Sequence, residues 1–113
     1  MGYEEQIGAL VRRLGVMLAE RGMMMTAAES CTGGWLAKAV TDVAGSSGWF
    51  ERGFVTYSNA AKQDMLGVRR EILEEHGAVS EATVRAMAEG ALSHSLADVS
   101  VAISGIAGPG GGT

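Results

Sequence analysis

Apolar residues recur every three or four positions along the first twenty residues of the chain. They are Ile7, Leu10, Val11, Leu14, Met17 and Leu18. This spacing places them on one face of a helix, so it predicts an amphipathic α-helix whose other face meets water. Gly22 follows the pattern and is expected to end the helix.

A second stretch has the same helical spacing, with an apolar face made by Trp35, Leu36, Ala39, Val40 and Val43. Ser30 or Thr32 is expected to cap its start, because serine and threonine are favoured N-caps. The run Gly45-Ser46-Ser47-Gly48 is expected to break it. Asn59 is the expected cap of a short helix that ends at Gly67.

Two helices are expected in the last third of the chain. A polar one covers residues 69–76 and ends at Gly77. The clearer one follows Ser80, its expected N-cap. Its apolar residues are spaced i, i+3, i+4, i+7 and i+8, and they are Val84, Met87, Ala88, Ala91 and Leu92.

Short apolar runs of strand length lie between these helices, at residues 23–28, 54–57 and 99–103. In the last run, Val99, Val101 and Ile103 alternate with small or polar residues, as in a half-buried strand. Strands separated by helices predict an α/β fold, with a mainly parallel sheet flanked by helices. The length of 113 residues allows one domain, so residues 1–113 are expected to form it.

Composition narrows the class of protein. The net charge is −4, and the only adjacent basic pairs are Arg12-Arg13 and Arg69-Arg70, so neither nucleic acid nor an anionic membrane is an expected partner. Cys31 is the only cysteine, which excludes an internal disulfide, and no Cys/His cluster has metal-site spacing. No signal peptide is expected, and no apolar run of about 20 residues is present in the sequence. A cytoplasmic location is expected.

Three polar, glycine-bearing loops follow the three expected strands. They are residues 29–34, residues 57–62 and residues 104–109. The carboxyl ends of parallel strands meet at one edge of a sheet, where ligands bind in open α/β folds. The sequence therefore predicts that these loops converge on a ligand site.

The chemistry of each loop taken alone is ambiguous. Ser30 and Thr32 could cap a helix only, or a backbone N–H in their loop could stabilise an oxyanion, with Gly33 and Gly34 letting a ligand approach. Cys31 is expected to be a packing residue, although a cysteine nucleophile stays open. The third loop is rich in glycine, as phosphate-binding loops are, but it lacks a Walker A motif and could equally be a flexible tail.

The second loop offers Tyr57 and Lys62. A buried lysine with a lowered pKa can serve as the base for a serine, as in Ser-Lys enzymes. Lys62 could equally be a solvated helix residue, with Tyr57 an aromatic at the strand end. Glu29 is the competing base on the same edge, and it could instead interact with a helix end.

Several of these stretches resemble the CinA C-terminal domain family, which includes the nicotinamide-mononucleotide deamidases. The stretches are Thr26-Ala27-Ala28-Glu29-Ser30-Cys31-Thr32-Gly33-Gly34, Gly53-Phe54-Val55-Thr56-Tyr57-Ser58-Asn59, Lys62, Gly77-Ala78-Val79-Ser80-Glu81 and Ser104-Gly105-Ile106-Ala107-Gly108-Pro109. They run in order from about residue 26 to the last residue. The resemblance implies hydrolysis of the carboxamide of nicotinamide mononucleotide, without a metal or other cofactor, usually by a homodimer.

The resemblance also implies roles for single residues. Ser30 would be the nucleophile, Lys62 its base, and Tyr57 an aid to proton transfer or orientation. The residues expected to line the nucleotide site are Thr32, Gly33, Gly34, Ser58, Asn59, Ser104, Gly105, Gly108, Pro109 and Gly110. Members of the family usually continue past the glycine loop with further strands and a helix, so the domain is expected to be incomplete here. The alternatives are a nucleotide-binding module without turnover and an inactive fragment.

Overall fold

The computed structural model describes residues 2–105, and Gly108, Pro109 and Gly110 of the expected site lie outside them. Three strands, β1 (Met25–Glu29), β2 (Phe50–Val55) and β3 (Val99–Ile103), form a parallel sheet in the order β2-β1-β3. Met25 pairs with Phe50 and Val99 at one end, and Glu29 pairs with Val55 and Ile103 at the other. The expected parallel α/β sheet is confirmed.

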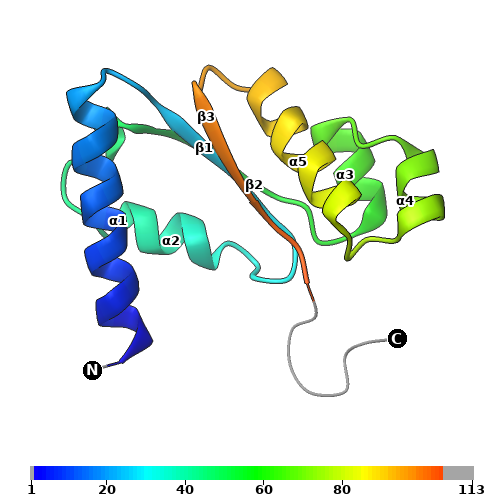
Figure 1. Ribbon diagram of the computed structural model, residues 1–113, viewed down its shortest axis with the longest axis horizontal. Coiled ribbons are helices and arrows are strands. Elements are labelled where there is room, and N and C mark those ends of the chain that lie inside the picture. Colours follow the sequence, from blue (N-terminus) through cyan, green and yellow to red (C-terminus); the bar gives the residue numbers. More distant parts are fainter. Residues whose placement is uncertain (1, 106–113) are drawn as a thin grey trace.

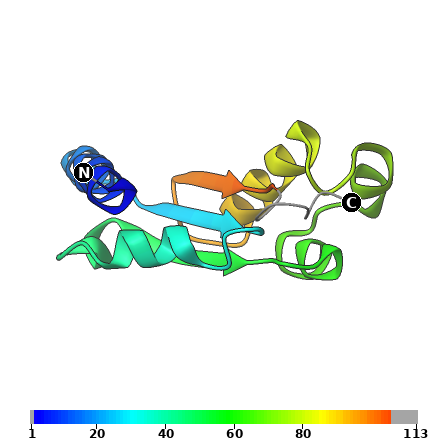
Figure 2. The ribbon, with the colours of Figure 1, turned by 90° about the horizontal axis from the view of Figure 1, so that it is seen from below.

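Helices cover both faces of this sheet (Figures 1 and 2). On one side lie α1 (Tyr3–Glu20) and α2 (Trp35–Thr41), followed by a 3₁₀ turn, η1 (Ser46–Gly48). On the other side lie α3 (Asn59–Leu66), α4 (Arg70–His76) and α5 (Glu81–Ser93). All five residues of the central strand β1 are buried, as expected for a strand covered on both faces.

Each face of the sheet has its own apolar core. Successive side chains of a strand point to opposite faces, so Ala28 packs with the α3–α5 side and Met25 with the α1–α2 side. The first core is built around Ala28, Leu66, Val68, Leu73, Met87 and Ala91. The second contains Val11, Leu18, Met25, Val40 and Trp49. Four residues of the predicted apolar face of α1 pack in this core, namely Ile7, Val11, Leu14 and Leu18, whereas Leu10 and Met17 of that face are exposed.

The expected second strand is wrong at both ends. The sequence predicts residues 54–57, whereas β2 begins at Phe50 and ends at Val55. The strand lies at an edge of the sheet and is mostly half-buried or exposed, so it tolerates Glu51 and Arg52 and lacks an apolar pattern at its start. The first strand is shifted by one or two residues, and the third is confirmed as residues 99–103.

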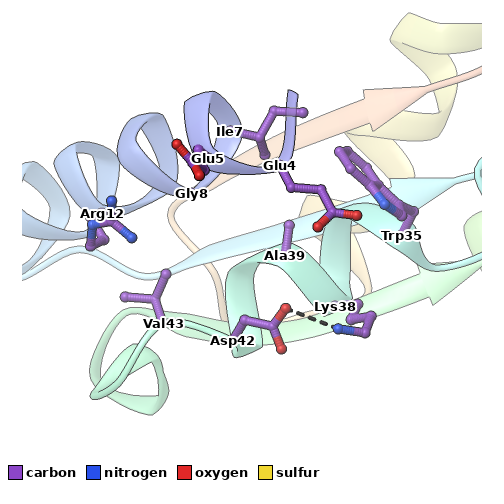
Figure 3. A pocket seen from close by; sticks show the side chains of 10 residues that line it. All are labelled: Glu4, Glu5, Ile7, Gly8, Arg12, Trp35, Lys38, Ala39, Asp42 and Val43. Carbon is purple, nitrogen blue, oxygen red and sulfur yellow. Dashed lines mark hydrogen bonds and ion pairs between the residues drawn. The ribbon is translucent and has the colours of Figure 1, made fainter. Parts of the chain in front are cut away.

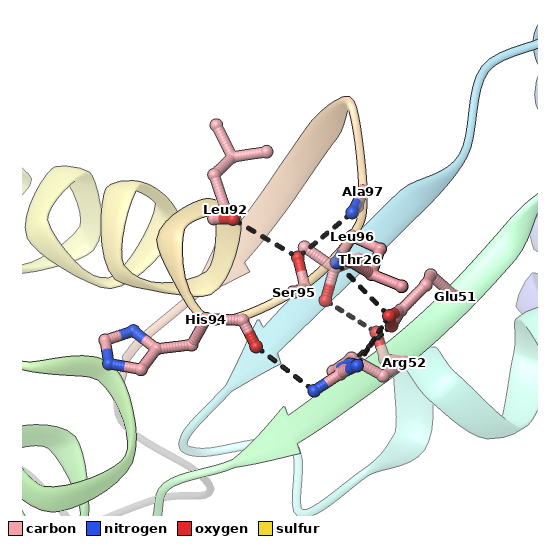
Figure 4. Close-up of polar contacts among 8 residues, drawn as sticks. All are labelled: Thr26, Glu51, Arg52, Leu92, His94, Ser95, Leu96 and Ala97. Atoms are coloured by element: carbon pink, nitrogen blue, oxygen red, sulfur yellow. Dashed lines mark hydrogen bonds and ion pairs between the residues drawn. The ribbon is translucent and has the colours of Figure 1, made fainter.

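Polar contacts of β2 tie the α5–β3 connection to the amino end of the sheet (Figure 4). Arg52 donates from Nη2 to Glu51 Oε1 at 2.7 Å and from Nη1 to the carbonyl of His94 at 3.1 Å. The backbone N–H of Leu96 donates to the same Glu51 carboxylate at 3.2 Å. The hydrogen bond from Arg52 lowers the pKa of Glu51. This network lies at the opposite end of the strands from the expected site.

Gly90 allows α5 to pack directly on the end of α3. A Cβ at this position would lie 1.9 Å from the carbonyl oxygen of Leu66, which is backbone and cannot rotate away. We expect Gly90→Ala to lower the free energy of unfolding by about 3 kcal/mol or more, through overpacking. Chemical denaturation measures this loss.

The matched control for that experiment is Gly8→Ala in α1. There the added Cβ would meet only the far end of the Arg12 side chain, at 3.3 Å. We expect a gain of up to about 1 kcal/mol, because alanine favours a helix more than glycine does. Equal effects at the two positions would contradict the packing of α5 on α3.

Candidate active site

Ser30 lies directly after β1, at the carboxyl end of the sheet. Its backbone N–H donates to the carbonyl of Ile103 at 3.0 Å, which fixes it against the end of β3. The residue is 7% exposed. The expected convergence of the first and third loops is confirmed, since a Cβ built on Gly105 would lie 3.5 Å from Cys31 Sγ.

Lys62 reaches Ser30 from α3, although the two are 32 residues apart in sequence. Its Nζ lies 3.0 Å from Ser30 Oγ, 3.2 Å from the carbonyl oxygen of Thr56 and 3.3 Å from that of Tyr57. The residue is 1% exposed. Within residues 2–105, no carboxylate forms an ion pair with it.

Burial lowers the pKa of Lys62 below its ordinary value, and the nearby Cys31 opposes this effect. The cause is that an ammonium group without a carboxylate partner is poorly solvated in the interior, so the neutral amine is favoured. The interpretation of Lys62 as a solvated helix residue is therefore wrong.

The Glu29 carboxylate binds the start of a helix and is not placed as a base for Ser30. Its side chain accepts hydrogen bonds from Thr32 Oγ1 at 2.7 Å and from the backbone N–H groups of Leu36 and Ala37 at 2.7 and 2.9 Å. These are free donors of the first turn of α2. The alternative that Glu29 interacts with a helix end is thus confirmed.

The expected N-cap of α2 is wrong in consequence. Neither Ser30 nor Thr32 caps this helix, because Gly34 occupies the N-cap position with φ 101° and no side-chain bond. The Glu29 carboxylate bonds the N–H groups that a cap would take. This arrangement is not visible in the local sequence, because Glu29 belongs to the preceding strand and approaches the helix only after the loop has folded back.

The second loop also starts its helix one residue earlier than expected. Ser58 is the N-cap of α3 and accepts from the N–H of Ala61 at 3.0 Å, whereas Asn59 is the first helical residue. Both are exposed. The Tyr57 side chain is 75% exposed, so only its carbonyl group contacts Lys62.

Gly33, Gly34 and Ser104 are further residues of the expected site. Gly33, with φ 63°, and Gly34 form the turn after Cys31, which is half-buried. Ser104 donates from its hydroxyl to the carbonyl of Ala78 at 2.8 Å. Within residues 2–105, no group of three His, Cys, Asp or Glu residues could hold a metal ion. No helix in the same range is both long and apolar enough to cross a membrane.

A separate cavity of about 460 Å³ lies between α1 and α2. Figure 3 shows its lining, in which Glu4 and Trp35 extend toward one another and Lys38 pairs with Asp42. Neither Ser30 nor Lys62 lines it. The cavity is therefore not the site formed by the three loops.

Comparisons with known proteins agree with this architecture. The sequence model of the CinA C-terminal domain family matches residues 8–113. Nicotinamide-nucleotide amidohydrolase PncC of Escherichia coli K12 is 59% identical over 110 residues, which are 97% of this chain and 67% of the relative. A putative competence-damage inducible protein of Symbiobacterium thermophilum is 64% identical over 99% of this chain and 26% of its own length.

Solved structures give the same result. The crystal structure of competence/damage inducible protein CihA from Agrobacterium tumefaciens is 54% identical, with a TM-score of 0.91 over 95% of this chain and 65% of that one. A CinA superfamily protein from Escherichia coli is 39% identical, with a TM-score of 0.92 over 99% of this chain. The chain spans about two thirds of the length of these structures. It belongs to the CinA C-terminal domain family.

Proposed function

We propose that this protein hydrolyses the carboxamide of nicotinamide mononucleotide to nicotinate mononucleotide and ammonia, with Ser30 as nucleophile and Lys62 as its base. The observation that carries the proposal is the distance of 3.0 Å between Lys62 Nζ and Ser30 Oγ in a buried setting. The name of the Escherichia coli relative, nicotinamide-nucleotide amidohydrolase, supports the choice of substrate.

The partners of Lys62 favour the role of a base. In the charged form, Lys62 Nζ donates to Ser30 Oγ and to the carbonyl oxygens of Thr56 and Tyr57. In the neutral form that its lowered pKa favours, the two carbonyls would bind its two N–H groups, and the lone pair would accept from the Ser30 hydroxyl. A serine hydroxyl that donates to a neutral base is activated for attack.

The reaction would proceed in two balanced halves. Ser30 Oγ attacks the carboxamide carbon while its proton passes to Lys62 Nζ, and the tetrahedral intermediate collapses when that proton is given to the departing nitrogen as ammonia. Water then attacks the resulting ester, again losing a proton to Lys62, and the proton returns to Ser30 Oγ as the ester bond breaks. Each half leaves Lys62 neutral.

The nucleotide itself would lie along the three loops. Backbone groups of the glycine-rich turns can hold its phosphate. The residues proposed to line the nucleotide site are Thr32, Gly33, Gly34, Ser58, Asn59, Ser104, Gly105, Gly108, Pro109 and Gly110. Tyr57 would assist by orienting the substrate or a proton, since its exposed ring is free to meet a ligand. A homodimer, which the family resemblance implies, and a cytoplasmic location, which the single cysteine favours, are part of the same proposal.

The test is product analysis with the natural protein that carries this sequence. We expect ammonia and nicotinate mononucleotide in equal amounts from nicotinamide mononucleotide, and far slower release from nicotinamide and its riboside, which lack the phosphate. Calorimetric binding of the nucleotide without ammonia would overturn hydrolysis in favour of a non-catalytic module. If the nucleotide does not bind and no ammonia is released, the loops serve only as helix caps and turns.

A further inference from the structure

Glu29 is a buried carboxylate that no cation neutralises within residues 2–105. It is 1% exposed and takes part in none of the ion pairs of that part of the chain. Its charge is instead stabilised by three donors, the Thr32 hydroxyl and the N–H groups of Leu36 and Ala37. Burying a charged group is costly unless it is hydrogen-bonded, so these three donors are what allows the carboxylate to be buried here.

These bonds close the loop that begins with Ser30. Glu29 is the last residue of β1, and its donors lie three, seven and eight residues later. The intervening loop contains Gly33 and Gly34, both at positive φ, and glycine restrains a backbone less than any other residue. Backbone bonds also join the loop to α2, from the N–H of Trp35 to the carbonyl of Thr32 at 3.2 Å and from the N–H of Lys38 to that of Gly34 at 3.0 Å, and the carboxylate adds the side-chain bonds.

Glu29 also touches the other wall of the site through its backbone. Its carbonyl oxygen accepts from the N–H of Thr56 at 2.8 Å. The carbonyl of Thr56 in turn binds Lys62 Nζ at 3.2 Å. One residue therefore holds the loop after Ser30 with its side chain and the segment before α3 with its main chain.

We infer that Glu29 is a positioning residue. Its carboxylate fixes the 30–34 loop and thereby keeps Ser30 Oγ in hydrogen-bond contact with the buried Lys62. Its effect on turnover rests on the proposed function, whereas its effect on the state of Lys62 does not. The Glu29 carboxylate binds the first turn of α2, whereas the Ser30 hydroxyl meets Lys62 of α3, so Glu29 acts through the loop.

The experiment compares Glu29→Gln and Thr32→Val with the native protein. Glutamine removes the charge and turns an N–H donor toward one of the helix N–H groups, while valine removes only the hydroxyl bond at 2.7 Å and keeps the charge. We expect kcat for nicotinamide mononucleotide to fall about 10- to 100-fold in Glu29→Gln, with KM changed less than about threefold, as for a small misplacement of reacting groups. Asp42→Asn, which removes an exposed carboxylate from the end of α2, is the matched control and should keep native kcat.

A second readout is the pKa of Lys62, followed by NMR of its side-chain carbon. Lys38, the other lysine of the chain, is exposed and serves as internal reference. A loosened loop admits water, so the pKa of Lys62 should rise toward its ordinary value in both variants. The Cys31 thiol, which is the titratable group that acts on the pKa of Lys62, is unchanged in each variant.

The two readouts separate the two claims. A folded Glu29→Gln protein with native kcat and a native Lys62 titration would overturn the positioning role. If Glu29→Gln does not fold, the titration of Lys62 in Thr32→Val decides, because that readout needs no substrate. If the native protein releases no ammonia, the proposed function fails, and the Lys62 titration alone decides the role of Glu29.

Discussion

Replacement of Lys62 by methionine is expected to lower kcat for amide hydrolysis by about 10³-fold, because no other base lies within hydrogen-bond distance of Ser30 Oγ in the described part of the chain. The same change should leave the fold as stable as the native one or more so. Methionine fills a similar volume, and it removes a buried amine that has no carboxylate partner. Ammonia release and urea denaturation measure the two effects.

The stability difference should depend on pH in a defined direction. The native pKa of Lys62 lies below its ordinary value of about 10.4, so between these two values the unfolded chain binds more protons than the folded one. The free energy of unfolding of the native protein therefore rises with pH through this window. The advantage of Lys62→Met should be largest below the native pKa and disappear toward pH 10.4.

Lys38→Met is the matched control, since Lys38 is exposed and pairs with Asp42 on the surface of α2. Exposed pairs of this kind contribute at most about 1 kcal/mol, so neither activity nor the pH dependence of stability should change much. In the native protein, kcat should rise with pH through the pKa of Lys62, because only the neutral amine accepts a proton. Native turnover in Lys62→Met would contradict its role as the base.

Replacement of Ser30 by alanine should lower kcat by about 10³-fold or more, with little change in KM. The hydroxyl contributes the bond-forming atom, and its loss leaves the backbone bond to Ile103 intact, so the fold should be preserved. Ammonia release with excess enzyme measures the residual rate.

Two controls accompany Ser30→Ala. Ser93→Ala removes a hydroxyl that bonds only the carbonyl of Gly90 and the ring of His94, far along α5, and should keep native kcat. Cys31→Ala tests the rival nucleophile beside Ser30. An inactive Cys31→Ala protein together with an active Ser30→Ala protein would transfer the reaction to the thiol.

The helices were predictable because their patterns are local. The spacing of apolar residues in α1 and α5, and Ser80 as the N-cap of α5, depend on residues a few positions apart. The start of β2 was not predictable, because an edge strand with little burial carries no apolar alternation. The expected caps Ser30, Thr32 and Asn59 were wrong for a related reason. Several polar residues lie close to each helix start in the sequence, and only the folded backbone determines which of them meets the free N–H groups.

The candidate site was predictable as an edge of the sheet but not as a set of contacts. Parallel strands must bring their carboxyl ends together, so the loops had to converge. Whether Lys62 is solvated or buried against Ser30 depends on how α3 packs on α5 and on the carbonyls of Thr56 and Tyr57. Glu29 was recognised as a possible helix-end partner, but its three donors are set by a loop that folds back over seven residues.

The most direct test of the central claim, that Ser30 and Lys62 act as one catalytic unit, is the turnover of the double variant Ser30→Ala/Lys62→Met. Residues that act as a unit are not additive, so we expect its kcat to lie within a few-fold of either single variant. Losses that multiply, giving about 10⁶-fold in place of about 10³-fold, would mean that the two side chains act independently, and would contradict the account.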